Sequence, residues 1–478
     1  MRLVYEDLGL LLASPGASES PPDPTPERFT RRDLTVGICT YDDFDGAWFT
    51  IASLLLHHPG PMRAAEILLV DNHPVGPVAQ ALKRLDAEIP NYRYVPVTSV
   101  RSTAVRDVLF RLAVGEVVVV LDSHVLLADG ALEAALSYLA RPEAARDLVQ
   151  GPVLQDDGVQ VMATHFAPAW SAGMYGRWEV DQRGLNPKGS AFEIPMQGLG
   201  AFACRRDAWV GINPHFRGFG GEEGYLHEKV RRAGGRTVCL PAMRWVHRFE
   251  RPYEVPYPIT WEDHLRNNLL AHQELELDEG LLLAHYQAEI GAQRTQAVRE
   301  ALAEEKAHPL AMFDGVVCPV ITDSHQVGDV GASARQGGDS SRSYAGGYRV
   351  MPVEVAPHPD PAVGQALAHR RCVACAHLHG WTTVLVVQDE AALTGPVPDP
   401  QRLASHGSAL ALRSAAGEIV WRYPRGPRDR DGAETRDIAA AAYHRSVFSW
   451  LLAELPITDR GAEAWVRDGG HLEALLRS

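Results

Sequence analysis

Short apolar runs and amphipathic stretches alternate along the first 125 residues. Four runs rich in aliphatic and β-branched residues have the length of buried strands: 34–39, 66–70, 92–97 and 117–121. Three stretches between them have apolar residues at helical spacing: 47–57, 78–87 and 103–112. The apolar face of the first helix is expected to carry Trp48, Ile51, Leu54 and Leu55. This βαβαβαβ series predicts parallel strands joined by right-handed crossovers.

Polar residues follow three of these strands at their carboxyl ends. Thr40 follows the first strand, Asp71 the second and Asp122 the fourth. Open α/β sheets bind ligands at this edge, so a nucleotide site is expected there. The sequence contains neither a Gly-x-Gly-x-x-Gly turn after the first strand nor a Gly-Lys-Ser/Thr loop. The phosphates of a nucleotide would therefore have to be neutralised in another way.

The fourth strand ends in Asp122-Ser123-His124. Residues i and i+2 at a strand end lie on the same side, so the carboxylate and the imidazole can converge on one point. One interpretation is a site for a divalent cation, which would neutralise phosphates. The alternative is a strand-terminating turn in which Asp122 caps the next segment.

The pattern changes after residue 148, where loops and aromatic residues dominate up to residue 200. A glycine-rich segment then leads into Glu222 and Glu223, and a helix is expected from there to residue 233. Acidic residues at a helix N-terminus are favoured by the helix dipole, so a purely structural role is the alternative to a catalytic one. A strand at 236–240 and a turn containing His247 follow. The helix is expected to bury Tyr225, Leu226 and Val230.

The order of these motifs resembles the GT-A-fold glycosyltransferases. Asp-Ser-His at a strand end, Gly-Gly-Glu at a helix start and Val-His-Arg-Phe downstream are most similar to the polypeptide N-acetylgalactosaminyltransferases and the family-2 enzymes. The resemblance covers about 34–251. It implies a Rossmann-like, mostly parallel α/β domain that transfers a hexose or N-acetylhexosamine from a uridine diphosphate (UDP) sugar. It also implies a metal site formed by Asp122, His124 and His247.

Further roles follow from the same resemblance. Two imidazoles and a carboxylate suit Mn²⁺ better than Mg²⁺ as the cofactor. The residues implied to bind the nucleotide sugar are Thr40, Tyr41, Asp71, Arg101, Asp122 and Arg248. For Arg101, a solvated charge at a helix start is the alternative interpretation.

The acidic pair leaves the stereochemistry open. In the peptide-modifying enzymes an Asn follows Gly-Gly-Glu, whereas inverting family-2 enzymes have an acidic pair whose second member is the base. The Glu-Glu pair of this chain matches neither pattern fully. We expect Glu222 to bind the donor sugar and Glu223 to act as the base.

The acceptor is expected to contact the region between these motifs, through Trp170, Trp178 and Gln197. Aromatic faces suit sugar rings, peptides and bases equally, and tryptophans are also common in cores. The acceptor classes that stay open are a peptide, a glycan, a lipid-linked sugar and a modified nucleobase.

The domain prediction has five parts. A flexible N-terminal arm (1–32) precedes the GT-A domain (33–258), a helical extension (259–327), a Gly/Ser-rich linker (328–347) and a smaller C-terminal α/β accessory domain (348–478). The last domain faintly resembles a shortened second glycosyltransferase-like unit, and a homo-oligomer could form through it. Its Cys-x-x-Cys motif indicates either core cysteines or a zinc site made of Cys372, Cys375 and His379.

Composition narrows the function classes. At 478 residues the chain is longer than a single hydrophobic core usually accommodates, so more than one domain is expected. A net charge of −14 argues against general affinity for nucleic acid or anionic membranes. No run approaches the roughly 20 apolar residues that span a bilayer, and no secretion signal is evident, so a cytoplasmic enzyme is expected. Two alternatives remain: a nucleotidyltransferase, which usually has a basic loop after its first strand, and a catalytically silent nucleotide-sugar-binding scaffold.

Overall fold

In the computed structural model, the described residues form two compact units, within Pro21–Glu300 and within Ala301–Ser478. The predicted arm (1–32), the predicted linker (328–347) and Arg101 lie outside these residues. The domain boundaries stay predictions. The described residues are 34–74, 76–97, 102–171, 174–249, 259–307, 315–321, 351–355, 361–379, 381, 383–387, 403, 408–413, 419–422 and 438–445.

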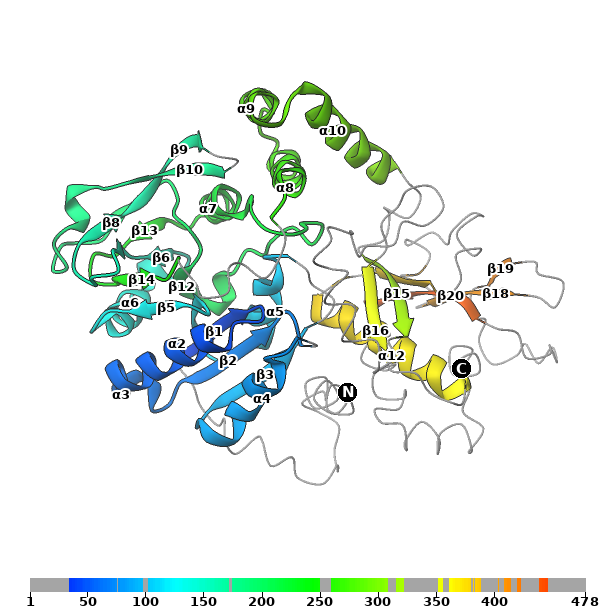
Figure 1. Cartoon of the computed structure of the whole chain (residues 1–478), viewed down its shortest axis with the longest axis horizontal. Coiled ribbons are helices and arrows are strands. Elements are labelled where there is room, and N and C mark those ends of the chain that lie inside the picture. Colours follow the sequence, from blue (N-terminus) through cyan, green and yellow to red (C-terminus); the bar gives the residue numbers. More distant parts are fainter. Residues whose placement is uncertain are drawn as a thin grey trace. The chain divides into compact units, whose positions relative to one another are not determined.

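The first unit is built on an eight-stranded sheet with the order β11-β13-β6-β12-β4-β1-β2-β3 (Figure 1). Four neighbouring strands are parallel, as predicted: β1 (Leu34–Thr40), β2 (Glu66–Asp71), β3 (Tyr92–Pro96) and β4 (Val117–Asp122). The other half is mixed, because β12 runs antiparallel to both β4 and β6. Its strands are β6 (Leu148–Gln150), β11 (Phe192–Glu193), β12 (Ala201–Arg205) and β13 (Thr237–Cys239). The α/β class with a mostly parallel sheet is confirmed.

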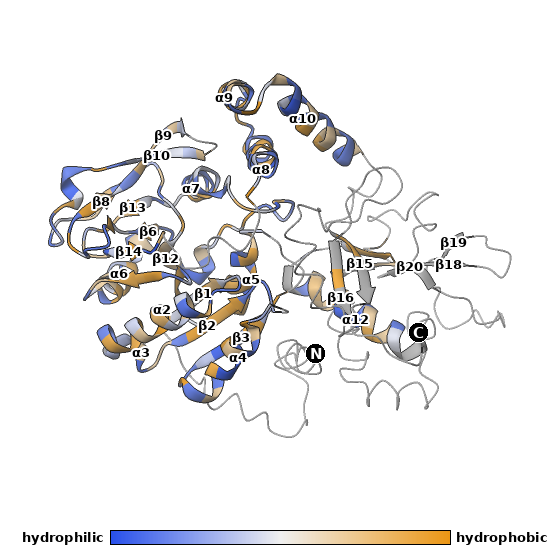
Figure 2. Cartoon of the chain, viewed as in Figure 1, coloured by the Kyte–Doolittle hydropathy of each residue, from blue (hydrophilic) through white to orange (hydrophobic). Residues whose placement is uncertain are grey.

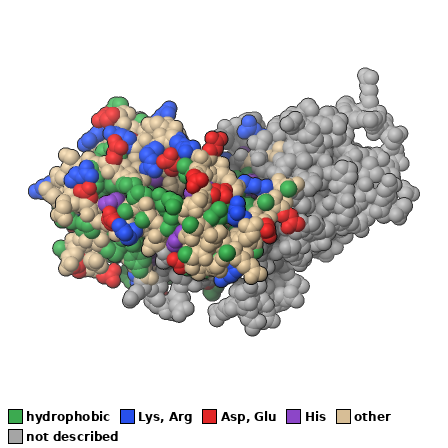
Figure 3. Space-filling view, turned by 90° about the horizontal axis from the view of Figure 1, so that it is seen from above, with side chains coloured by type: hydrophobic (Ala, Val, Ile, Leu, Met, Phe, Trp, Pro, Cys, Tyr) green, Lys and Arg blue, Asp and Glu red, His purple; other side chains and the backbone are tan. Residues whose placement is uncertain are grey.

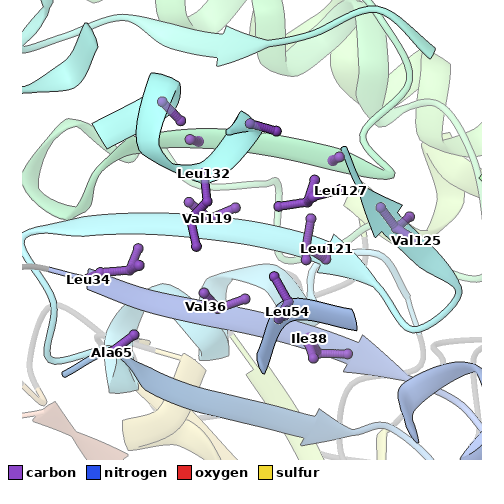
Figure 4. Close-up of a cluster of buried hydrophobic side chains, with 14 of the residues drawn as sticks. Leu34, Val36, Ile38, Leu54, Ala65, Val119, Leu121, Val125, Leu127 and Leu132 are labelled. Atoms are coloured by element: carbon purple, nitrogen blue, oxygen red, sulfur yellow. The ribbon is translucent and has the colours of Figure 1, made fainter. Parts of the chain in front are cut away.

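Helices cover both faces of the parallel half. Val36 and Ile38 of β1 pack in one apolar cluster with Leu54 of α2 (Figure 4). Ile51 of the same helix belongs to this cluster. Side chains alternate between the faces of a strand, so Gly37 faces the other way, toward Leu109 of α5. A Cβ at Gly37 would lie 2.3 Å from the Leu109 side chain, so glycine lets this helix approach the sheet. The helices are α2 (Phe44–His57), α3 (Pro59–Met62), α4 (Ala79–Glu88), α5 (Val105–Leu112) and α6 (Ala131–Leu139).

One part of the predicted apolar face of α2 is wrong. Ile51 and Leu54 are fully buried, but Trp48 and Leu55 are 39% and 36% exposed. The buried stripe is narrower than the apolar stripe, because the helix packs on the sheet along one line only. In Figure 2 the central strands of this sheet are mostly apolar, whereas the helices carry both apolar and polar residues.

The remaining elements of the first unit extend from the mixed half of the sheet. A four-stranded sheet has the order β5-β14-β7-β8, a β9–β10 hairpin lies beside α7, and three helices follow (Figure 1). The expected turn at His247 is the end of strand β14 instead, because Trp245 to His247 pair with β5. The bounds are β5 (Val125–Leu127), β7 (Val153–Leu154), β8 (Val161–Ala163), β9 (His165–Ser171), β10 (Met174–Glu179), β14 (Trp245–His247), α7 (Glu222–Arg232), α8 (Trp261–Glu274), α9 (Gly280–Ile290) and α10 (Ala292–Ala307).

The second unit contains a six-stranded sheet with the order β16-β15-β17-β20-β18-β19. Its first five strands repeat the chain order, spatial order and directions of β2-β1-β4-β12-β6. The strand β15 occupies the end of the predicted helical extension, where its apolar β-branched sequence favours a strand over a helix. The bounds are β15 (Gly315–Ile321), β16 (Met351–Val355), α12 (Pro361–His379), β17 (Thr383–Val387), β18 (Ser408–Arg413), β19 (Ile419–Arg422) and β20 (Ile438–His444).

Two expectations concern the surface and the Cys-x-x-Cys motif. On the face seen in Figure 3, the basic and acidic side chains of the described residues are interspersed. Every helix in the described part of the chain is too short or too polar to cross a membrane. Cys372 and Cys375 are buried on α12 and form no disulfide, while the side chain of His379 lies outside the described residues. The zinc site therefore stays a prediction.

The packing of α2 gives a direct stability test. Leu54 is 1% exposed and Leu56, two residues later on the same helix, is 75% exposed. We expect Leu54→Ala to lower the free energy of unfolding by about 2–5 kcal/mol, because it leaves a cavity against the sheet. The matched control Leu56→Ala should change it by less than about 0.5 kcal/mol. Urea unfolding followed by circular dichroism measures both, and equal losses would contradict the packing of α2 described above.

Candidate functional site

Three side chains that are distant in sequence converge at the carboxyl edge of the parallel strands. Asp122 ends β4, His124 lies in the turn between β4 and β5, and His247 ends β14. The antiparallel pairing of β14 with β5 places His247 opposite Val125, next to His124. The ligand atoms of the three residues all lie within 4.8 Å of one another. The structure therefore brings together the three predicted metal ligands.

The side chains of Asp122, His124 and His247 lie close to one another. Nε2 of His247 is 3.7 Å from Oδ2 of Asp122. The two imidazole rings are nearly perpendicular, with centroids 4.7 Å apart. Among the described residues, this is the one group of three or more His, Cys, Asp or Glu side chains whose ligand atoms come this close.

The chemistry of His124 fits a metal ligand. The residue is buried, and its Nε2 has no hydrogen-bond partner among the described residues. A buried imidazole nitrogen without a partner carries an uncompensated desolvation cost, which a bound cation would remove. Two imidazoles and one carboxylate form a donor set suited to Mn²⁺ or another transition metal. Three protein ligands also leave coordination positions for substrate oxygens.

Asp43 orients His124, although no motif in the sequence indicates this residue. Nδ1 of His124 lies 3.1 Å from Oδ2 of Asp43, so the Nδ1–H tautomer donates to this carboxylate and keeps the Nε2 lone pair for a metal. Ser123 Oγ donates to the same oxygen at 2.7 Å. The backbone N–H of Gly46 donates to Oδ1 at 3.0 Å, which makes Asp43 the N-cap of α2. Burial would raise the pKa of Asp43, but the hydrogen bonds from His124, Ser123 and Gly46 outweigh it and lower this pKa.

Arg106 links the predicted metal site to the acidic pair. Its guanidinium is buried, with Nη2 3.3 Å from Asp122 Oδ1 and Nη1 3.7 Å from Glu222 Oε1. Burial alone would raise the pKa of Asp122, but the nearby imidazole of His247 and the charge of Arg106 hold it far below its usual range. The sequence contained a signal for Arg106, because this cation interrupts the apolar face of the helix Val105–Leu112.

The two glutamates at the start of α7 are both buried, at 1% and 8% exposure for Glu222 and Glu223. Gly220 and Gly221 precede them with φ of +92° and +90°, a left-handed backbone that glycine adopts without strain. This turn starts the helix directly beside Arg106. Burial raises the pKa of both carboxyls, and the neighbouring charge of Glu222 raises that of Glu223 further.

The predicted nucleotide residues cluster at the ends of β1 and β2. Thr40 and Asp71 are buried and face each other in the strand register. Both carboxylate oxygens of Asp71 accept hydrogen bonds, from the backbone N–H of His73 at 2.9 Å and from the Tyr94 hydroxyl at 2.6 Å. Tyr41 stacks on the His73 ring, with centroids 4.7 Å apart. The roles of these residues stay predictions.

Arg248 lies next to the predicted metal ligands. Its backbone N–H donates to the carbonyl of His124 at 3.1 Å, and its side chain is exposed. This hydrogen bond joins the segment after β14 to the turn after β4. A role of the side chain in phosphate binding stays a prediction.

The three predicted acceptor residues lie in different surroundings. Trp170 is half-buried and stacks on His285, with centroids 5.2 Å apart. Trp178 is 39% exposed and packs edge-on against Phe249. Gln197 is fully buried, and its Nε2 donates to the carbonyls of two loop residues, Gly151 at 3.1 Å and Thr164 at 2.7 Å. Gln197 therefore holds the loops together, and the prediction that it contacts an acceptor is not supported by this placement.

The Asp43–His124 contact predicts a specific effect on metal binding. We expect Asp43→Asn to weaken Mn²⁺ binding about 10- to 100-fold, because an amide orients the imidazole less strongly than a carboxylate. Asn remains a good N-cap, so α2 should be retained. Titration of free Mn²⁺ followed by electron paramagnetic resonance measures the affinity.

A second cap serves as the control for Asp43→Asn. Thr260 caps α8 by accepting a hydrogen bond from the backbone N–H of Asp263. Thr260→Ala should cost about 1 kcal/mol of stability and leave Mn²⁺ binding unchanged. Mn²⁺ affinity that is unchanged in Asp43→Asn would contradict the orienting role.

The acidic pair predicts a dependence of stability on pH. The pKa of Glu223 is raised in the folded chain, so its contribution to stability is fully present below its ordinary pKa of 4.5 and is lost as the pH rises above it. In the wild type we expect the urea concentration at the unfolding midpoint to fall as the pH rises from about 5 to 8. This fall should be smaller in Glu223→Gln, with both proteins measured in EDTA.

Glu228 on the same helix is the matched control for Glu223→Gln. Hydrogen bonds from Arg232 and Arg231 outweigh burial and lower its pKa. Glu228→Gln should therefore give no gain of stability at pH 8. A pH profile of Glu223→Gln that equals the wild-type profile would contradict the raised pKa.

Comparisons with known proteins agree with the motifs. Residues 35–209 match the sequence model of the family described as "Glycosyl transferase family 2". The predicted resemblance to family-2 glycosyltransferases is confirmed over this stretch. No curated protein matches the chain significantly in sequence.

Several solved structures share a low similarity with the chain. GalNAc-T7 with UDP, GalNAc and Mn²⁺ is 14% identical with a TM-score of 0.42, and the match covers 56% of this chain and 55% of that one. The mannosyltransferase PcManGT from Pyrobaculum calidifontis, in complex with GDP-Man and Mn²⁺, is 17% identical with a TM-score of 0.36, covering 65% and 84%. S. aureus TarS 1–349 is 14% identical with a TM-score of 0.33, covering 66% and 95%. The chain thus spans about half of the GalNAc-T7 structure, and these similarities are too low to transfer residue roles.

Proposed function

We propose that the chain is a metal-dependent glycosyltransferase that uses a nucleoside-diphosphate sugar, with a UDP-hexose or UDP-N-acetylhexosamine as the expected donor. The observation that carries this proposal is the convergence of Asp122, His124 and His247 at the ligand-binding edge of the sheet. The match of residues 35–209 to the family-2 model supports the same activity.

A metal held by Asp122, His124 and His247 would neutralise the diphosphate and the charge that develops on the leaving nucleoside diphosphate. The protein supplies a second positive group in Arg106, which lies 3.3 Å from Asp122 and is buried. A cation fixed in a site of low dielectric stabilises developing negative charge without having to reorganise. Thr40, Tyr41 and Asp71 are proposed to hold the nucleoside at the neighbouring strand ends.

Glu222 and Glu223 have different roles in this proposal, at the donor sugar and at the acceptor. Glu222 lies on the side of Arg106 and the metal ligands, which suits a contact with a donor-sugar hydroxyl. Glu223 is proposed to accept the proton of the acceptor hydroxyl as it attacks the anomeric carbon. Burial raises its proton affinity, which brings a carboxylate closer to the pKa that a general base needs near neutral pH. A base in this position corresponds to inversion at the anomeric carbon.

Donor hydrolysis tests the proposal without knowledge of the acceptor. We expect Mn²⁺-dependent release of UDP from at least one of UDP-glucose, UDP-galactose and their N-acetyl forms, with GDP-mannose as a further donor in the panel. Asp122→Ala and His247→Ala should each lower the rate about 100-fold or more, because each removes a ligand of the charge-neutralising ion. EDTA should have the same effect on the wild type.

A histidine remote from the site provides the control. His57 is exposed and pairs with Asp129 on the surface, so His57→Ala should keep the wild-type rate. Normal turnover in Asp122→Ala or His247→Ala would contradict the metal assignment. Tight UDP binding without turnover of any donor would favour the scaffold alternative.

A further inference from the structure

A cavity of about 270 Å³ lies beside the acidic pair, between α7, the end of α8 and the β9–β10 hairpin. Glu223 and Gly224 of α7 line it on one side, Tyr175 and Met196 on a second side, and His272 on a third. All of these elements belong to the first unit. Glu223, the proposed base, lines this cavity, and the proposed function leaves its occupant open.

Glu223 lines the cavity and is buried, with 8% of the residue exposed. Glu222, the preceding residue, lies instead next to Arg106, at 3.7 Å. Successive side chains on a helix point about 100° apart, so the two carboxylates lie on different sides of the first turn of α7. One side is the predicted metal site, and the other is the cavity.

The charges around the cavity disfavour an anionic ligand. Arg231 is the one cation among its lining residues, and its guanidinium is already engaged. It pairs with Glu228 at 3.0 Å and donates to the carbonyl of Pro195 at 2.6 Å. Glu223 has no cation within the cavity to balance it. A phosphate or carboxylate would therefore meet a carboxylate and no free positive charge, whereas a hydroxyl can donate to Glu223.

The apolar part of the wall is an aromatic face held in a fixed position. Tyr175 packs against Gly224, where a Cβ would lie 2.8 Å from the tyrosine ring. Trp170 supports Tyr175 from the hairpin, with ring centroids 4.9 Å apart. A rigid aromatic surface with a hydrogen-bond acceptor beside it suits a ring that has an apolar face and hydroxyls at its edge. A sugar ring has this character.

The volume of the cavity is sufficient for one sugar ring. Pockets for drug-sized ligands measure roughly 300–1,000 Å³, and this cavity is slightly smaller, at about 270 Å³. Building on the proposed function, we propose that the cavity binds the acceptor, and that the acceptor is a glycan which presents one uncharged sugar ring to Tyr175 and a hydroxyl to Glu223. This selects one of the acceptor classes that the sequence leaves open.

The test uses the full chain with UDP and Mn²⁺, and methyl glycosides as probes. Methyl glycosides of glucose, galactose, mannose, xylose, N-acetylglucosamine and N-acetylgalactosamine are examined by saturation-transfer NMR. N-acetyl-serine amide and N-acetyl-threonine amide represent a peptide acceptor. We expect at least one glycoside to bind and neither amide to do so. Tyr175→Ala should weaken glycoside binding at least tenfold, and Tyr175→Phe should restore it, because it returns the aromatic face.

Trp48, an exposed aromatic residue on α2, provides the control, and Trp48→Ala should leave glycoside binding unchanged. Binding of the amides but not the glycosides, or of no probe, would overturn the glycan assignment. Glycoside binding that survives Tyr175→Ala would overturn the assignment to this cavity. Donor hydrolysis separates the two proposals: hydrolysis without glycoside binding contradicts only the acceptor site, and glycoside binding without hydrolysis contradicts only the proposed function.

Discussion

The buried guanidinium of Arg106 is the group on which the arrangement of this site depends. Asp122 and Glu222 are two carboxylates brought into one buried region by different elements, β4 and α7. Without a cation between them the two carboxylates would repel each other, and the buried Glu222 would carry the desolvation cost of an uncompensated charge. Arg106 contacts both, at 3.3 and 3.7 Å. Arg106 is part of α5. The close packing of α5 on the sheet at Gly37 therefore also fixes the position of the Arg106 guanidinium.

The same cation separates the tasks of the acidic residues. Together with His247 it lowers the pKa of Asp122, against the effect of burial, and so favours the ionised form that a metal ligand requires. At Glu222 its charge opposes the effect of burial, whereas Glu223 lies farther along the helix and is influenced mainly by burial and by Glu222. One helix start thus holds two carboxyl groups in different electrostatic surroundings. Such a difference is the usual basis for giving neighbouring acids different roles.

The sequence predicted those features that depend on local pattern. The strands ending at Thr40, Asp71 and Asp122 are visible as aliphatic runs, and their shared edge follows from parallel pairing. His247 could be placed through the order of motifs, although its position at the end of a strand follows from the pairing of β14 with β5. Asp43 was missed because its role arises from contact with His124, 81 residues away. The hydrogen bonds of Gln197 could not be predicted, because a polar side chain in a loop gives no indication that its amide donates to two carbonyls distant in sequence.

The double role of Asp43 has a thermodynamic consequence. One carboxylate caps α2 through Gly46 and holds His124 in the orientation for a metal. Any ligand that favours this position of His124 also favours the capped helix, and reciprocally the intact cap favours the ligand by the same free energy. The first turn of α2 and the occupancy of the proposed metal site are therefore linked equilibria. Fraying of α2 at residue 43 would therefore lower the metal affinity at His124, which lies more than 80 positions away in the sequence, although none of the three metal-binding side chains has changed.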